Sequence, residues 1–172
     1  MISPSHTTPT SPTEQPQLNA HNKTEFPPMH TAEHLLNQTM VRMFGCERSR
    51  NAHIERKKSK ISYSLATCPT EAQVQQIVNR MNELIQADLP VSYEYIQAHE
   101  VPSNIKLDRL PNNASEVLRL VRIGQYDVCP CIGLHVHSTA ELKEFILLGT
   151  NWDGERHTFR LRFKLGVQWS TP

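Results

Sequence analysis

Two pairs of residues, each four positions apart, have the chemistry to share one metal ion. His30 and His34 lie in a segment of helical periodicity, so they occupy one face of the helix, one turn apart. Cys131 and His135 repeat the spacing around Gly133. A thiolate with three imidazoles is a common tetrahedral zinc set, and sulfur and nitrogen donors disfavour magnesium and calcium. We therefore expect one Zn²⁺ per chain, with the ligands His30, His34, Cys131 and His135.

Three neighbouring residues offer similar chemistry. Glu33 lies between the two histidines, but the order His-Thr-Ala-Glu-His differs from the metalloprotease motif, in which Glu directly follows the first His. Cys129 and His137 flank the second pair and are spare ligands of the right type. We expect Cys129 to be a buried thiol and His137 a surface imidazole.

A basic segment spans residues 48–60 and holds six of the 18 Lys and Arg of the chain, with Glu55 as its only acid. Such local density is typical of phosphate binding, although a solvated surface is the common alternative. The formal net charge of +1 gives no global attraction to nucleic acid. The residues expected to contact phosphates are Arg50, Arg56, Lys57, Lys58 and Lys60.

The length and composition indicate one domain with an N-terminal tail. The chain has 172 residues, and residues 1–28 are rich in Pro, Ser and Thr, which predicts a disordered tail followed by a domain over 29–172. Four cysteines are too few for a disulfide framework at this length. With no signal peptide and no apolar run long enough for a membrane span, we expect a cytoplasmic protein.

Two helices are predicted. The first covers residues 30–44 and ends at Gly45, a good C-terminal residue for a helix. The second begins after Thr70, because Gln73 completes a capping box three residues later, and it ends before Pro90.

Strands are predicted from alternating apolar residues at 60–66, 91–98, 117–123, 145–148 and 158–165. Asp153-Gly154 is a turn signal between the last two strands. Residues 99–116 are expected to be mostly irregular, and 139–143 to form one helical turn. This order predicts an α+β fold, a two-layer sandwich with a mainly antiparallel sheet packed against helices.

The motifs resemble one known family. His-Thr-Ala-Glu-His-Leu-Leu at 30–36, followed by Cys-Ile-Gly-Leu-His-Val at 131–136, resembles the editing domain of alanyl-tRNA synthetases and the free-standing AlaX proteins. Threonyl-tRNA synthetases carry a related domain. The segments 70–91 and 121–131 also resemble the family, so the similarity covers residues 29 to 166.

The resemblance implies an activity. It implies zinc-dependent hydrolysis, in trans, of the ester that joins seryl or glycyl groups to the tRNA for alanine, with the aminoacylated acceptor end as partner and with neither DNA nor membrane. Because only 29 residues precede His30, the chain is expected to be the short form, without a synthetase catalytic domain. The zinc is expected to shape the pocket and orient the substrate, with activation of a water as the alternative.

The chain departs from the family's Cys-Gly-Gly-Thr-His pattern at two positions. Ile132 replaces a glycine and Leu134 a threonine, which predicts a narrowed or altered pocket. Candidate catalytic residues are Thr31, Glu33 and His53, of which Thr31 could instead bond a backbone carbonyl of its helix.

Two other functions stay open on sequence alone. One is a zinc-bearing tRNA- or protein-binding module that has lost catalysis, and the other is a hydrolase of a different small ester or amide.

Overall fold

A computed structural model describes residues 26–107 and 117–168. The helices are α1 (Pro27–Phe44) and α2 (Glu71–Gln86), with 3₁₀ turns η1 (Ala98–Glu100) and η2 (Thr139–Leu142). The strands are β1 (Asn51–His53), β2 (Ser59–Ser64), β3 (Val91–Gln97), β4 (Val117–Ile123), β5 (Asp127–Pro130), β6 (Phe145–Asp153) and β7 (Thr158–Leu165).

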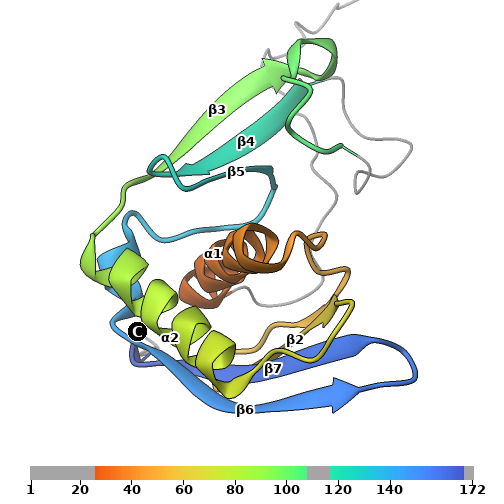
Figure 1. Cartoon of the computed structure of the whole chain (residues 1–172). Coiled ribbons are helices and arrows are strands. Elements are labelled where there is room, and N and C mark those ends of the chain that lie inside the picture. The colour runs from red at the N-terminus through yellow and green to blue at the C-terminus, as the bar shows by residue number, and fades with distance from the viewer. Residues whose placement is uncertain (1–25, 108–116, 169–172) are drawn as a thin grey trace, which may run out of the picture.

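The strands form two antiparallel sheets. One has the order β1-β2-β7-β6 and the other the order β3-β4-β5. Helix α1 lies between the two sheets, and α2 packs beside it against the larger sheet (Figure 1). The predicted α+β sandwich with antiparallel sheets and packed helices is therefore confirmed.

Helix α1 is held by an apolar stripe that includes Leu35, Leu36 and Met40, each fully buried. It ends as predicted: Gly45 adopts a φ of 65°, and its N–H donates to the Val41 carbonyl at 2.9 Å. Its start differs from the prediction, because the helix begins at Pro27, which suits the first turn.

The folded part begins earlier than the predicted boundary at residue 29. Phe26 is 5% exposed and joins the core, and Pro28 is also buried. Prolines dominate the end of the predicted tail, which favours an irregular chain. Pro27 nevertheless starts α1, because the first residues of a helix have no backbone hydrogen bond for a proline to remove. The predicted disorder of residues 1–25 lies outside the described residues.

Helix α2 has the predicted capping box. The Gln73 N–H donates to Thr70 Oγ1 at 3.1 Å, and the Thr70 N–H donates to Gln73 Oε1 at 2.9 Å. The helix buries one apolar face, made by Ile77, Met81, Leu84 and Ile85.

The strands differ from the prediction in number and length. All five predicted strands are present, but β6 runs on to Asp153, and the short strands β1 and β5 were not predicted. The turn falls where Asp153-Gly154 indicated: Asp153 Oδ1 accepts from the backbone N–H of Glu155 and Arg156, both at 3.1 Å. The missed strand β5 matters most, because it leads into the second pair of candidate ligands.

The helices carry no membrane-spanning segment. Among the described residues, neither α1 nor α2 combines the length and hydrophobicity that crossing a bilayer requires.

Candidate metal centre

The four expected metal ligands converge at one place in the fold. His30 and His34 lie on α1, and Cys131 and His135 lie on the segment between β5 and η2. Their ligand atoms all lie within 4.8 Å of one another. Ligand atoms around a tetrahedral zinc are roughly 3.3–3.8 Å apart, so a small inward movement would complete the site. Residues far apart in the chain thus form one group able to bind a metal.

Two of the three imidazoles turn their Nδ1 atoms away from the centre. His30 Nδ1 lies 3.3 Å from the Leu134 carbonyl oxygen, and His30 Nε2 lies 3.3 Å from Cys131 Sγ. His135 Nδ1 lies 2.9 Å from Thr31 Oγ1, while its Nε2 is buried without a hydrogen-bond partner. A buried nitrogen that has no hydrogen-bond partner and belongs to a group of ligand atoms within 4.8 Å of one another fits a metal ligand.

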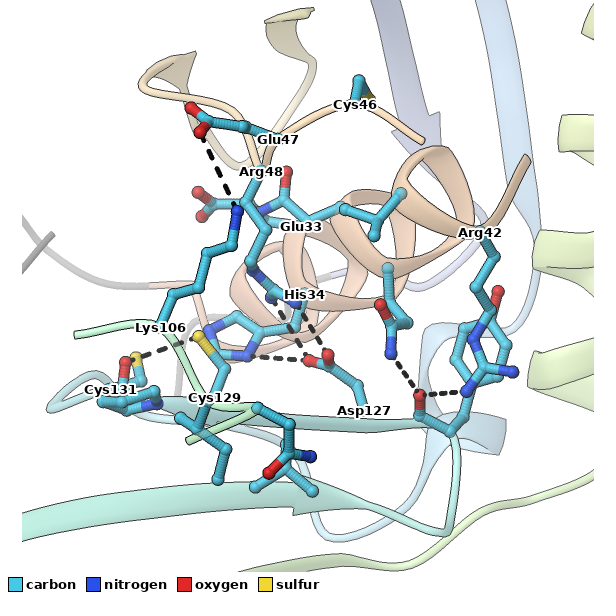
Figure 2. A pocket seen from close by; sticks show the side chains of 18 of the residues that line it. Glu33, His34, Arg42, Cys46, Glu47, Arg48, Lys106, Asp127, Cys129 and Cys131 are labelled. Atoms are coloured by element: carbon cyan, nitrogen blue, oxygen red, sulfur yellow. Dashed lines mark hydrogen bonds and ion pairs between the residues drawn. The ribbon is translucent and has the colours of Figure 1, made fainter. Parts of the chain in front are cut away.

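The third imidazole faces a buried carboxylate. His34 Nδ1 lies 3.6 Å from Asp127 Oδ2, and Asp127 is 2% exposed (Figure 2). Arg48 holds that carboxylate through two hydrogen bonds, at 2.7 and 3.2 Å. Burial raises the pKa of Asp127, but the neighbouring His34 ring and the Arg48 charge outweigh it and lower the pKa overall. A carboxylate behind a ligating histidine fixes the ring and its tautomer.

The electrostatics of the group favour a thiolate. Burial raises the pKa of Cys131, but the three imidazoles around it, of His135, His30 and His34, prevail and lower it to about 2. For His34, burial lowers the pKa, whereas the neighbouring Asp127 and Cys131 side chains raise it to about 9. Burial lowers the pKa of His135 to about 4. Cys131 is therefore ionised at neutral pH, which is the form that binds metals.

The loop that carries Cys131 is fixed by two features. Gly133 is buried, and a Cβ atom there would overlap the His30 ring, so a side chain is excluded. Arg119 on β4 donates from Nε to the Cys131 carbonyl at 2.7 Å, and it also bonds the Gly133 carbonyl. Gly133 thus leaves space for the His30 ring, and Arg119 holds the backbone of the loop through its hydrogen bonds.

A cavity of about 560 Å³ adjoins the group. It is lined by three of the expected ligands, His30, His34 and Cys131, and by charged residues of α1 and of the loop after it (Figure 2). Volumes of this size suit small ligands. Ile132 and Leu134 do not line it and are 37% and 58% exposed. Neither side chain therefore narrows this cavity.

The structure separates the three candidate catalytic residues. Thr31 is fully buried, where its hydroxyl meets His135 and accepts from the Val136 N–H at 3.3 Å. Among the described residues, the Thr31 hydroxyl has no hydrogen bond to a carbonyl of its own helix. Its contact with the His135 ring favours a role in orienting that ring. Glu33 lines the cavity. His53 is exposed on β1 and lines a separate small pocket with Lys60, apart from the metal-ligand group.

The predicted tRNA contacts all lie on the surface. They are Arg50, Arg56, Lys57, Lys58 and Lys60. Of these five, only Arg50 also lines the cavity. Of the spare ligands, Cys129 is half-buried and lines the cavity, and His137 is exposed. The metal-ligand group contains neither of them.

The sequence did not predict that Asp127 and Arg119 belong to the site. It also did not predict that Arg48 pairs with Asp127. Asp127 stands alone in an apolar stretch and Arg119 alternates with apolar residues on β4, which is a weak signal for a residue directed at a site. Arg48 looked like part of the basic segment, whereas it is paired with Asp127.

Comparisons with known proteins agree with the site. The model of the threonyl and alanyl tRNA synthetase second additional domain matches residues 118–160, which include Cys131 and His135. The chain is 29% identical over 140 residues to the alanyl-tRNA editing protein AlaX-L of Pyrococcus horikoshii, covering 81% of this chain and 34% of that protein. The chain is therefore similar to an alanyl-tRNA editing protein and, over residues 118–160, to the second additional domain of these synthetases.

Two synthetases support the same assignment. The alanine–tRNA ligase of Treponema denticola is 27% identical over 119 residues, covering 69% of this chain and 20% of the ligase. That of Oceanobacillus iheyensis is 29% identical over 117 residues, covering 67% and 13%. The chain thus spans about a third or less of the length of these curated relatives, and the resemblance predicted from its motifs is confirmed.

Proposed function

We propose that this AlaX-type chain hydrolyses the ester of mischarged aminoacyl-tRNA in trans, with seryl- or glycyl-tRNA for alanine as the substrate. The observation that carries the proposal is a group of three histidines and a cysteine, of which His30, His34 and Cys131 line a cavity of about 560 Å³. A relative named as an alanyl-tRNA editing protein supports the choice of substrate class. Because charged tRNA is used in the cytoplasm, the protein would act there.

The four converging residues would hold one Zn²⁺: His30, His34, Cys131 and His135. Held by four protein ligands, the zinc would supply a fixed positive charge beside the ester, which would shape the pocket and orient the substrate. Thr31 and Asp127 hold the rings of His135 and His34 in ligating orientation through their Nδ1 atoms. These two histidine rings would thus be oriented before the metal binds.

Glu33 is the residue we assign to proton transfer. Among the described residues that line the cavity, Asp127 is paired with Arg48, and Glu47 with Arg50 and Lys106, whereas Glu33 has no ion pair. An unpaired carboxylate can accept the proton of a water as its oxygen attacks the ester carbonyl. The ester C–O bond then breaks, and the ribose hydroxyl leaves with a proton.

The exposed basic residues would contact the phosphates of the tRNA: Arg50, Arg56, Lys57, Lys58 and Lys60. Such contacts give sequence-independent, salt-sensitive affinity. Replacing Lys57 and Lys58 together by Ala is expected to weaken tRNA binding and to lower its salt dependence, leaving hydrolysis at saturating tRNA intact.

The test is deacylation of seryl-, glycyl- and alanyl-tRNA by the whole chain. We expect hydrolysis of the first or second, loss of it in Glu33→Gln with the zinc content unchanged, and loss of both zinc and activity in Cys131→Ala. Cys129→Ala is the matched control and keeps its zinc. Absence of hydrolysis of all three tRNAs overturns the proposal, and tight tRNA binding in that case indicates a non-catalytic module.

A further inference from the structure

An exposed aromatic surface lies on the smaller sheet beside the candidate metal centre. Tyr93 and Tyr95 are 44% and 67% exposed, and they share one face of β3 because they are two residues apart. Arg119 pairs directly with Tyr95 across the sheet, and its Cζ atom lies 4.7 Å from the centre of the Tyr93 ring. We call these three residues the tyrosine face.

The tyrosine face is continuous with the metal centre. The Tyr93 ring centre lies 6.4 Å from that of His135. Arg119 also bonds the backbone carbonyls of Cys131 and Gly133, so one side chain contacts both the tyrosine and the ligand loop. None of the three residues lines the cavity. The metal centre therefore lies between the cavity and the tyrosine face.

The composition of the face indicates what it binds. Exposed rings and an arginine guanidinium are the groups on which unpaired nucleobases stack, because every base has a π surface. The nearest acid of β3, Glu94, points to the opposite side of the sheet, where it pairs with Arg122 at 3.2 Å. The face is thus aromatic and positively charged, which suits RNA better than an apolar protein partner.

We propose that the tyrosine face is a stacking surface for the unpaired bases at the 3′ end of the tRNA. The inference rests on the proposed function, since an ester on the terminal ribose at the metal centre puts the preceding bases next to His135. It assigns the cavity to the aminoacyl side of that ester and the tyrosine face to the nucleotide side. Figure 1 shows that β3 is an outer strand of its sheet, away from the helices.

The test is the binding of a fluorescently labelled single-stranded RNA ending in C-C-A, the 3′ sequence shared by tRNAs, measured by anisotropy. We expect Tyr95→Ala and Tyr93→Ala each to raise the Kd roughly tenfold, the size expected for one lost stacking contact. Tyr95→Phe keeps the ring and is expected to bind within about twofold of the parent protein. The matched control is Leu148→Ala, a residue 43% exposed on β6 of the other sheet.

Two further measurements keep the outcomes separate. Zinc content and melting temperature report whether each variant is folded, and deacylation of full-length tRNA reports the proposed function. Alanine variants that bind the RNA as tightly as Leu148→Ala does overturn the inference, even if the protein hydrolyses its tRNA. Tyrosine-dependent RNA binding without any hydrolysis supports the inference and overturns the function.

Sedimentation tests the competing use of the face as a contact between two copies of the chain. A dimer that dissociates in Tyr95→Ala, with unchanged RNA binding, overturns the stacking proposal.

Discussion

At the scale of single residues, the candidate metal centre depends on side chains that are not themselves ligands. Gly133 leaves space for the His30 ring, and Asp127 faces Nδ1 of His34 from behind. Such residues set ring orientation, so their replacement is expected to change metal affinity while all four ligands stay in place.

Gly133→Ala is expected to displace the His30 ring, because the new methyl group would overlap it. Zinc retained after dialysis against a chelator should fall well below one equivalent, as measured by elemental analysis. Gly154→Ala is the control, since a Cβ there meets its nearest neighbour at an ordinary 3.5 Å. Full zinc retention in Gly133→Ala would contradict the ligand assignment for His30.

Asp127→Asn keeps the size of the side chain and removes the charge facing His34. We expect zinc affinity to fall about 10- to 100-fold, as is usual when such a partner of a ligating histidine is lost. Competition with a coloured chelator measures the affinity. Asp88→Asn, at an exposed position, controls for a lost carboxylate, and equal affinities in the two variants would refute the role of Asp127.

At the scale of elements, the start of helix α2 is set by residues next to it in the sequence. The site, by contrast, depends on pairing between strands. The capping box of α2 is complete within four residues, Thr70 to Gln73. Strand β5, by contrast, has four residues and exists only through its pairing with β4, in the register Val121 to Cys129. That pairing places Asp127 against α1.

Thr70→Ala removes one side of the capping box and is expected to destabilise the protein by about 1 kcal/mol. Chemical denaturation followed by circular dichroism measures the change. Thr67→Ala, an exposed residue just outside the helix, is the control and should be close to neutral. Equal stabilities for the two variants would mean that the cap contributes nothing to α2.

At the scale of the whole molecule, the metal centre joins the N-terminal helix to a segment some hundred residues later in the sequence. His30 and Leu134 alone are separated by 104 positions. A ligand that binds only the folded state stabilises it by mass action, by about 2.7 kcal/mol when its free concentration is 100 times its Kd. Metal binding is therefore expected to add to the stability of the core.

Chelation is expected to lower the melting temperature of the parent protein without unfolding it at room temperature. The buried cluster of α1, α2 and the larger sheet includes Met40, Met81 and Phe163 and contains none of the four candidate ligands. Calorimetry with and without EDTA measures the shift, and Cys131→Ala should show none. An equal EDTA shift in Cys131→Ala would place the metal elsewhere.

The sequence by itself determined the parts that depend on short-range spacing. Positions four apart on a helix share a face, so the His30 and His34 pair was predictable, as was the cap at Thr70. The grouping of all four candidate ligands was predictable because Cys131 and His135 repeat that spacing with compatible chemistry.

Only the tertiary structure decided which distant residues meet. The pairing of β5 with β4 brings Asp127 to His34, and the loop's course turns Ile132 and Leu134 outward instead of into the cavity. Tyr93 reaches His135 through the register of β3 on β4. The physical reason is that register and packing result from contacts summed over the whole sheet and core, which no local spacing encodes.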